Sequence, residues 1–170
     1  MRSKAKGRWI DAALKTMVLS NQRAAECLQE YGATACTDLT GFGLLGHLVE
    51  MTRASAVDAM LYMDQLPILD GAQETVAAGI LSSLHPQNLR LRRALQDFKK
   101  VSLHPVFPLL FDPQTVGGLL AGVPQKRADD GAGHFTHAQR EPLRFYQFKE
   151  RPGREEIIEF IEHEGMLTNR

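Results

Sequence analysis

Residues 33–51 read ATACTDLTGFGLLGHLVEM, and this stretch predicts a short strand, a glycine loop and a helix in succession. The small and β-branched residues from Ala33 to Thr37 are typical of a buried strand. Gly41 and Gly43 let the backbone turn tightly and approach a ligand closely. Leucines then recur at three- and four-residue spacing, so we expect a helix that begins just after Gly43.

The predicted turn places a carboxylate beside a loop that suits an anion. The first amides of the helix would face the loop, and this end of a helix favours negative charge. Asp38 offers the oxygen ligands that Mg²⁺ takes in nucleotide-phosphate sites. The spacing, however, matches neither the phosphate-loop nor the dinucleotide fingerprint. On spacing alone, an ordinary strand-to-helix turn in which an Asp or Thr caps the helix is the favoured alternative.

The remaining segments predict further helices and strands. Apolar residues at helical spacing indicate helices, and period-two alternation or a short apolar run indicates strands. We expect helices at 9–18, 21–31, 70–78 and 90–98, strands at 59–63 and 119–123, and a loop at 82–90. Short connections between such elements predict a layered α/β sandwich, an open sheet with helices packed on one side.

The chain changes character after Pro124. Charged residues occupy 17 of the 46 positions in 125–170, against 23 of the first 124 (40 in the whole chain minus 17). We therefore expect residues 1–124 to form one domain and residues 125–170 to be an atypical charged tail. A narrow apolar stripe of Ile157, Ile158 and Ile161 predicts one late helix, from Arg154 to Glu164.

Composition narrows the possible partners. The 20 basic and 20 acidic residues give a formal net charge of zero, so no global field attracts nucleic acid or an acidic membrane. Basic residues between Arg90 and Lys100 alternate with apolar ones at helical spacing, which favours a solvated helix face. No apolar run is long enough to span a bilayer. Two cysteines and no secretory signal predict a cytoplasmic protein.

Three motifs, in the same order along the chain, resemble selenophosphate synthetase (selenide, water dikinase). They are TDLTGFGLLGH at 37–47, SSLHPQNLR at 82–90 and LFDPQTVGGLL at 110–120. The resemblance extends from about Trp9 to Pro124 and covers only the C-terminal half of that enzyme. It implies an α+β fold, the C-terminal domain of the aminoimidazole-ribonucleotide-synthetase type. The chain departs from this pattern after Pro124, because the helix and closing apolar strand with which the family would continue are not evident there.

The resemblance also implies a site for ATP and Mg²⁺, with ATP as a co-substrate bound only together with the N-terminal half. By matching motif positions, Asp38 is implied to bind the metal. The residues implied to line the ATP site are Thr40, Gly41, Phe42, Gly43, Asp112, Gln114, Thr115, Gly117 and Gly118. Asp112, Gln114 and Thr115 have no more defined role than a place near the cleft. Val116 departs from the pattern, because relatives often have a small polar residue there.

The reactive cysteine or selenocysteine of this family, its neighbouring lysine and most ATP-binding carboxylates are implied to lie in the N-terminal half. The 170 residues do not contain that segment. We expect Cys27 at a core position of a helix and Cys36 in a buried strand, and neither has glycine and lysine neighbours. Neither is therefore a credible nucleophile, and we expect no catalytic residue in this chain.

Two hypotheses of different classes follow. In the first, the chain is the C-terminal half of a selenide, water dikinase, inactive alone, whose partner is the N-terminal half or a second subunit. In the second, it is a non-catalytic binding or oligomerisation module derived from that domain. Both predict a protein that binds no nucleic acid and no membrane.

Several histidines and one asparagine leave alternatives open. His47 is favoured as a satisfied structural histidine over a catalytic base. His134 and His137 have no further ligands at zinc spacing, so a zinc site there is disfavoured. His85 and Asn88 either touch substrate or close a turn.

Overall fold

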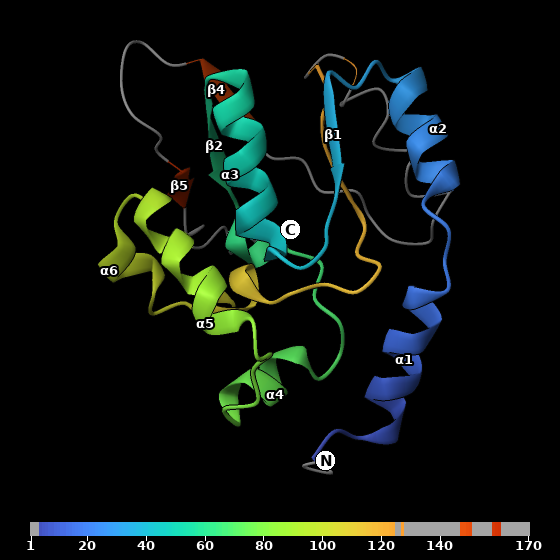
Figure 1. The fold of residues 1–170 in the computed structure, drawn as a ribbon, viewed down its shortest axis with the longest axis vertical. Helices are drawn as coiled ribbons and strands as arrows, with labels where there is room; N and C mark the ends of the chain where they lie inside the picture. Colours follow the sequence, from blue (N-terminus) through green and yellow to red (C-terminus); the bar gives the residue numbers. More distant parts are fainter. Residues whose placement is uncertain (1–3, 125–126, 128–146, 151–157, 161–170) are drawn as a thin grey trace, which may run out of the picture.

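The computed structural model describes residues 4–124, 127, 147–150 and 158–160. Within these residues, the chain forms short helices and strands (Figure 1). In chain order they are α1 (Gly7–Met17), α2 (Gln22–Glu30), β1 (Ala35–Asp38), α3 (Gly43–Ser55), β2 (Val57–Leu61), η1 (Met63–Gln65), α4 (Ala72–Ala77), α5 (His85–Asn88), η2 (Leu89–Ala94), α6 (Phe98–Val101), η3 (Phe107–Phe111), β3 (Leu119–Gly122), β4 (Gln147–Glu150) and β5 (Ile158–Phe160), where η marks a 3₁₀ helix. In this described part, no helix has the length and apolar character needed to cross a membrane.

The strands lie in two small sheets. β1 and β3 pair antiparallel, with Ala35 opposite Gly122 and Asp38 opposite Leu119. β2 is the middle strand of the other sheet, antiparallel to β4 and parallel to β5. The predicted α+β class is confirmed, although the single open sheet that we expected is divided in two.

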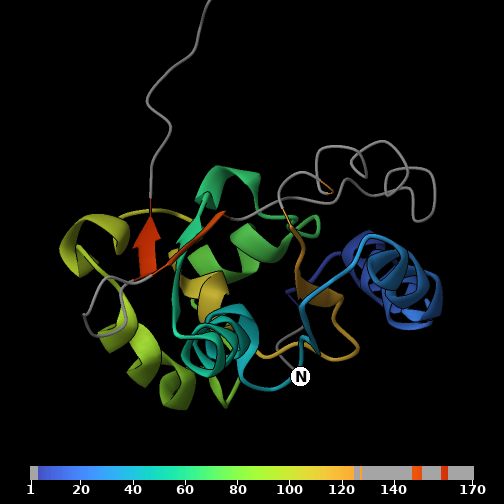
Figure 2. The same cartoon turned by 90° about the horizontal axis from the view of Figure 1, so that it is seen from above.

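Helices cover both sides of the β1–β3 pair. α3 packs against β1, and α2 packs against β3. Figures 1 and 2 both place α1 and α2 on the opposite side of this pair from α3. The sequence patterns predicted these helices individually, but the expectation of helices on one side only does not hold for this sheet.

The core forms around one face of α3. Leu45 and Leu48 are completely buried there, and they share one apolar cluster with Leu61 of β2 and with Leu110 and Phe111 of η3. Burying each such side chain contributes roughly 1.5 to 3 kcal/mol before conformational entropy is counted. The cluster thereby fixes the start of α3 and the end of η3, the two points from which the glycine-containing loops leave.

The segment 82–98 differs from the prediction. In place of a loop followed by a helix to Phe98, it forms the four-residue α5, the 3₁₀ helix η2 and then the start of α6. Pro86 lies in the first turn of α5, where its missing N–H is tolerated. His85 and Asn88 are buried three residues apart, and therefore on one face. Because these buried residues are polar, apolar periodicity does not reveal the helix.

The late helix predicted from Arg154 to Glu164 is wrong at the positions that the structure describes. Ile158–Phe160 forms β5, which pairs with β2 so that Ala59 lies opposite Ile158. A short apolar run fits a strand as well as a helix, and here pairing with β2 selects the strand. The rest of that segment lies outside the described residues, as do His134 and His137. The domain boundary at residue 124 stays a prediction.

Candidate functional site

The β1–β3 pair brings two loops side by side, namely residues 39–43 (the first glycine loop) and residues 112–118 (the second glycine loop). The first follows β1 and leads into α3, and the second leads from η3 into β3. Three backbone hydrogen bonds join them: Leu39 N–H to Gly118 O (3.0 Å), Gly117 N–H to Leu39 O (3.1 Å) and Gln114 N–H to Thr40 O (2.9 Å). The structure thus brings together the motifs that the sequence placed about 75 residues apart.

The four glycines of these loops fall into two kinds. At Gly43, where φ is +70°, a Cβ atom would lie 3.0 Å from the carbonyl oxygens of Leu110 and Asp112. At Gly117 a Cβ would collide with the Leu39 carbonyl. These two glycines serve the close contact between the loops. A Cβ at Gly41 or Gly118 would meet no atom of the described residues within 4 Å, so this part of the structure leaves the backbone there open to an incoming group.

His47, on the first turns of α3, holds Thr40 in the first glycine loop. The Thr40 N–H donates to Nε2 of His47 at 3.1 Å, and the Thr40 hydroxyl lies 3.1 Å from the same nitrogen. Since Nε2 accepts, the ring proton is on Nδ1, which is buried without a hydrogen-bond partner among the described residues. The prediction of a structural histidine therefore holds for Nε2, whereas Nδ1 is not satisfied.

Asn88 and His85 connect α5 to η3, and Asn88 also connects it to the first glycine loop. The Asn88 side-chain amide donates to Gly41 O at 2.8 Å and to Phe111 O at 3.1 Å. The Nε2 of His85 lies 3.0 Å from Pro108 O, and the imidazole meets the Phe111 ring edge-on. The contacts of both side chains are therefore with other residues of this chain.

A further contact comes from a residue that sequence reasoning missed. Asn21, which precedes α2, donates its side-chain amide to Gly117 O at 3.0 Å. The two residues are 96 positions apart, so no local sequence pattern predicts the contact.

Asp38 lies at the end of β1, exposed to solvent. Its carboxylate makes no hydrogen bond or ion pair with any residue that the structure describes. The first residues of α3 receive no side-chain cap, so the alternative in which an Asp or Thr caps this helix is not realised. The Asp38 carboxylate is thus available to a group from outside the described chain.

Asp112 begins the second glycine loop and is half-buried beside η3. Burial raises the pKa of its carboxyl above the ordinary value, and nearby His85 lowers it in part. Its backbone carbonyl accepts a 3.2 Å hydrogen bond from the Gln114 side chain. This hydrogen bond stabilises the part of the loop that directly follows η3.

The side chains of Phe42, Thr115 and Val116 project from the two loops towards solvent. Phe42 is 62% exposed and Val116 is 53% exposed, although both are large and apolar. Val116 also has a φ of +52°, a left-handed conformation that is strained for a β-branched residue. The position at which the resemblance implies a small polar residue is therefore one with backbone strain.

The described residues do not by themselves form a complete metal site. No group of three or more His, Cys, Asp or Glu among them could hold an ion. Mg²⁺ in nucleotide sites commonly takes only one or two protein carboxylates, together with water and phosphate oxygens. The unengaged Asp38 carboxylate fits one such ligand, and the others must come from substrate or from further protein.

Neither cysteine has the properties of a nucleophile. Burial raises the pKa of the Cys27 thiol, and Glu30 raises it further. Cys36 is exposed, which corrects the prediction of a buried position, because side chains alternate between the two faces of β1. Partial burial raises the pKa of its thiol, and the Asp38 carboxylate adds to this effect. Both thiols stay protonated at neutral pH.

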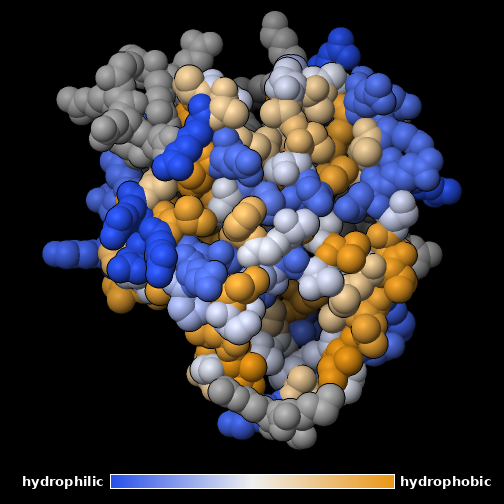
Figure 3. Space-filling view, in the orientation of Figure 1, coloured by the Kyte–Doolittle hydropathy of each residue, from blue (hydrophilic) through white to orange (hydrophobic). Residues whose placement is uncertain are grey.

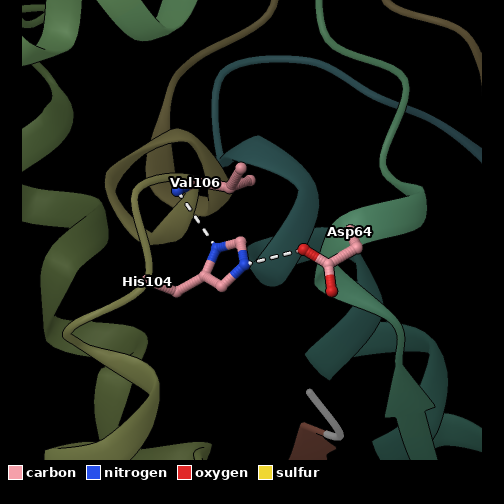
Figure 4. A network of polar contacts seen from close by, with 3 residues as sticks. All are labelled: Asp64, His104 and Val106. Atoms are coloured by element: carbon pink, nitrogen blue, oxygen red, sulfur yellow. Dashed lines mark hydrogen bonds and ion pairs between the residues drawn. The ribbon is translucent and has the colours of Figure 1, made fainter. Parts of the chain in front are cut away.

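A cavity of about 560 Å³ lies near η1 and the start of η3, lined by none of the glycine-loop residues. Three of its lining residues form a polar network, in which His104 lies between Asp64 and Val106 (Figure 4). The Val106 N–H donates to Nδ1 of His104 at 3.2 Å, so the proton is on Nε2, which lies 3.0 Å from the Asp64 carboxylate. Both imidazole nitrogens are therefore engaged, and His104 connects two segments without a free lone pair for base catalysis.

The fold and the two joined loops define the class of the protein. The chain belongs to the family described as AIR synthase related protein, C-terminal domain, whose family model matches residues 9–142. The resemblance stated from the three motifs is confirmed, because the relatives it matches are named selenide, water dikinase.

Three of these relatives show the extent of the match. The protein from Caldanaerobacter subterraneus subsp. tengcongensis is 38% identical over 118 residues, which cover 69% of this chain and 34% of that protein. The relative named selenide, water dikinase 2 from Peptoclostridium acidaminophilum is 37% identical over 74% of this chain and 36% of its own length. The relative from Trichlorobacter lovleyi is 41% identical over 64% of this chain and 31% of its own length. The chain spans about a third of the length of the relatives it matches.

Proposed function

We propose that this domain forms one wall of the active cleft of a selenide, water dikinase, which makes selenophosphate from ATP and selenide. One observation carries the proposal: two glycine loops are held together while Gly41 and Gly118 stay open, and Asp38 lies unengaged at their edge. The relatives, which are named selenide, water dikinase, support the reaction class.

In this proposal, the open loop backbones face the phosphates of ATP. The residues that line the ATP site are those of the two loops, Thr40 to Gly43 on one side and Asp112, Gln114, Thr115, Gly117 and Gly118 on the other. Asp38 is a ligand of Mg²⁺, and bound Mg²⁺ would neutralise the polyphosphate charge. The hydrogen bonds between the loops keep the backbone fixed, so that little reorganisation is needed when phosphate arrives.

The rest of the synthetase supplies the nucleophile in this proposal. Cys27 and Cys36 both have raised pKa values, and in the described residues neither has a basic group that would lower them. The partner is therefore the N-terminal part of such an enzyme, encoded separately or in the same chain, or a second subunit. The 170 residues alone are expected to be inactive.

A chimera tests the proposal. Residues 9–124 replace the matching segment of the Caldanaerobacter relative, and selenide-dependent AMP formation from ATP is measured. The chimera should turn over, whereas the 170-residue chain and the relative without its C-terminal third should not. A folded chimera with no turnover, beside an active parent enzyme, would contradict the proposed function.

One observation favours the alternative of a binding or oligomerisation module. Helix α1 has no buried residue. Its Ile10 and Leu14 are 50% and 55% exposed, and Val18, which directly follows the helix, is 83% exposed. Figure 3 shows apolar side chains, in orange, at the lower right of the molecule, where Figure 1 places α1. Sedimentation of the 170-residue chain distinguishes the two, since a stable oligomer together with an inactive chimera would favour the module.

A further inference from the structure

α5 carries two buried side chains that contact η3, and one of them also reaches the first glycine loop. His85 contacts Pro108 O and the Phe111 ring, and so attaches the short helix to η3. Asn88, three residues later on the same face, spans from Phe111 O to Gly41 O. One residue thus touches the end of η3, where the second glycine loop begins, and the middle of the first glycine loop.

The chemistry of the two acceptors fixes the orientation of the Asn88 amide. Both Gly41 and Phe111 present carbonyl oxygens, which only accept hydrogen bonds. The side-chain nitrogen must therefore face them, and both of its N–H groups are used. With 7% of its surface exposed, Asn88 has no room to exchange these bonds for water.

Gly41 is the residue whose position depends most on this contact. Before Gly41 in the chain, Leu39 and Thr40 are held by the backbone hydrogen bonds between the loops. After it, Gly43 is held by its tight contact with η3. The Asn88 amide holds the Gly41 carbonyl between these two points, and the other face of Gly41 stays open. Asn88 thereby acts from behind the loop without occupying the side that a ligand would approach.

We propose that Asn88 is a positioning residue, which sets the separation of the two glycine loops through Gly41 O and Phe111 O and so aligns the backbone that faces phosphate. The loop-setting part follows from the contacts alone, and the part that concerns phosphate rests on the proposed function. A turn-closing or substrate-binding role for Asn88 would predict different contacts, either with its own segment or with the open face.

Amide hydrogen exchange on the 170-residue chain tests the loop-setting part without any activity. Asn88→Asp is nearly isosteric but places an oxygen against two carbonyl oxygens, and Asn88→Ala removes both donors without introducing a charge. In each variant the Gln114 and Gly117 amides should exchange at least tenfold faster, since small misalignments weaken hydrogen bonds steeply. The Thr34 amide, bonded to Gly122 O at the far end of the sheet, should keep its protection. Equal acceleration at all three amides, or none, would overturn the proposal.

Kinetics in the chimera test the part that concerns phosphate. Measured well below the melting temperature, Asn88→Ala should lower kcat by about 10- to 100-fold per folded molecule, as displacements of about 1 Å typically do. Leu61→Val, a core change in β2 away from the loops, should lower the melting temperature without lowering kcat. If both variants lose activity only in proportion to unfolding, Asn88 is merely structural. If the unsubstituted chimera is inactive, the proposed function fails together with this part, and amide exchange still decides the loop-setting role.

Discussion

Different kinds of interaction hold the glycine loops and helix α1 in place. The loops are fixed by backbone hydrogen bonds, by the buried polar side chains of His47 and Asn88, and by contacts too close for a side chain at Gly43. Each of these interactions needs one particular geometry, because hydrogen bonds weaken quickly as they bend or lengthen.

Helix α1 is fixed much less specifically. Its amphipathic pattern forms a helix, but the apolar face is half exposed, and Trp9 packs over Gly71 with Lys6 across its ring. The difference teaches that buried polar groups specify the shape of a site, whereas apolar periodicity specifies a helix without specifying what covers it. A test of the comparison should therefore disturb the loops strongly and α1 weakly.

The largest effect is expected for Gly43→Ala. A Cβ there meets two carbonyl oxygens at 3.0 Å, and φ is +70°. The left-handed conformation costs roughly 1 to 2 kcal/mol and overpacking roughly 1 to 3 kcal/mol, so the free energy of unfolding should fall by about 2 to 5 kcal/mol. Urea denaturation measures this change. Gly41→Ala, in open space, is the matched control and should change stability little. Similar losses in both variants would contradict the division of the glycines into two kinds.

Val116→Gly should increase stability. Val116 is 53% exposed, so little apolar burial is lost, and its φ of +52° is one that glycine adopts freely. Relief of roughly 1 to 2 kcal/mol of strain, less the chain entropy of glycine, leaves a gain of about 0.5 to 1 kcal/mol in urea. Val116→Ala keeps the unfavourable φ and should show no gain. A loss of stability in Val116→Gly would mean that contacts of the Val116 side chain stabilise the fold by more than the backbone strain destabilises it.

Asp112→Asn should raise the melting temperature at pH 7 but not at pH 3.5. The pKa of Asp112 is raised in the folded state, so its favourable contribution is complete below the unfolded pKa of about 3.9 and is lost as pH rises through the folded pKa. The gain should stay below about 1 kcal/mol, because a half-exposed carboxyl is partly solvated. A variant that is less stable than the parent at pH 7 would show that the ionised carboxylate is stabilised in the fold.

The smallest effect is expected for Leu14→Gln on α1. The side chain is already 55% exposed, and Gln is a good helix former, so stability should change by less than about 0.5 kcal/mol. Thermal unfolding measures the change, and sedimentation shows whether the exposed face pairs with another copy. A loss of more than about 2 kcal/mol, the range for a buried leucine, would show that α1 is covered in solution.

Local patterns predicted much of this fold. The stretch 33–51 yields β1 and α3 because its strand, glycine turn and helix are each determined by near neighbours in the sequence. The same reasoning failed for Ile158–Phe160, because pairing with β2 selects a strand there. It also failed for Cys36, whose exposure depends on which face of β1 packs inward.

The two glycine loops were predictable from the sequence, but the contacts that support them were not. The motifs identified both glycine loops, and the register of β1 with β3 brings them together. The contacts of Asn88 with Gly41 and of Asn21 with Gly117 join residues 47 and 96 positions apart, so they depend on the whole fold. Sequence reasoning therefore left the role of Asn88 open.

The central claim is that the Asp38 carboxylate serves a metal and phosphate site, and its most direct test is Asp38→Asn in the active chimera. The carboxylate makes no hydrogen bond or ion pair with a described residue, so the melting temperature should change little. Turnover should fall at least tenfold, since loss of even an outer partner of a metal ligand commonly costs 10- to 100-fold. Asp70→Asn, another exposed aspartate, is the control and should leave both unchanged. Unchanged turnover in Asp38→Asn, with or without a loss of stability, would contradict the account.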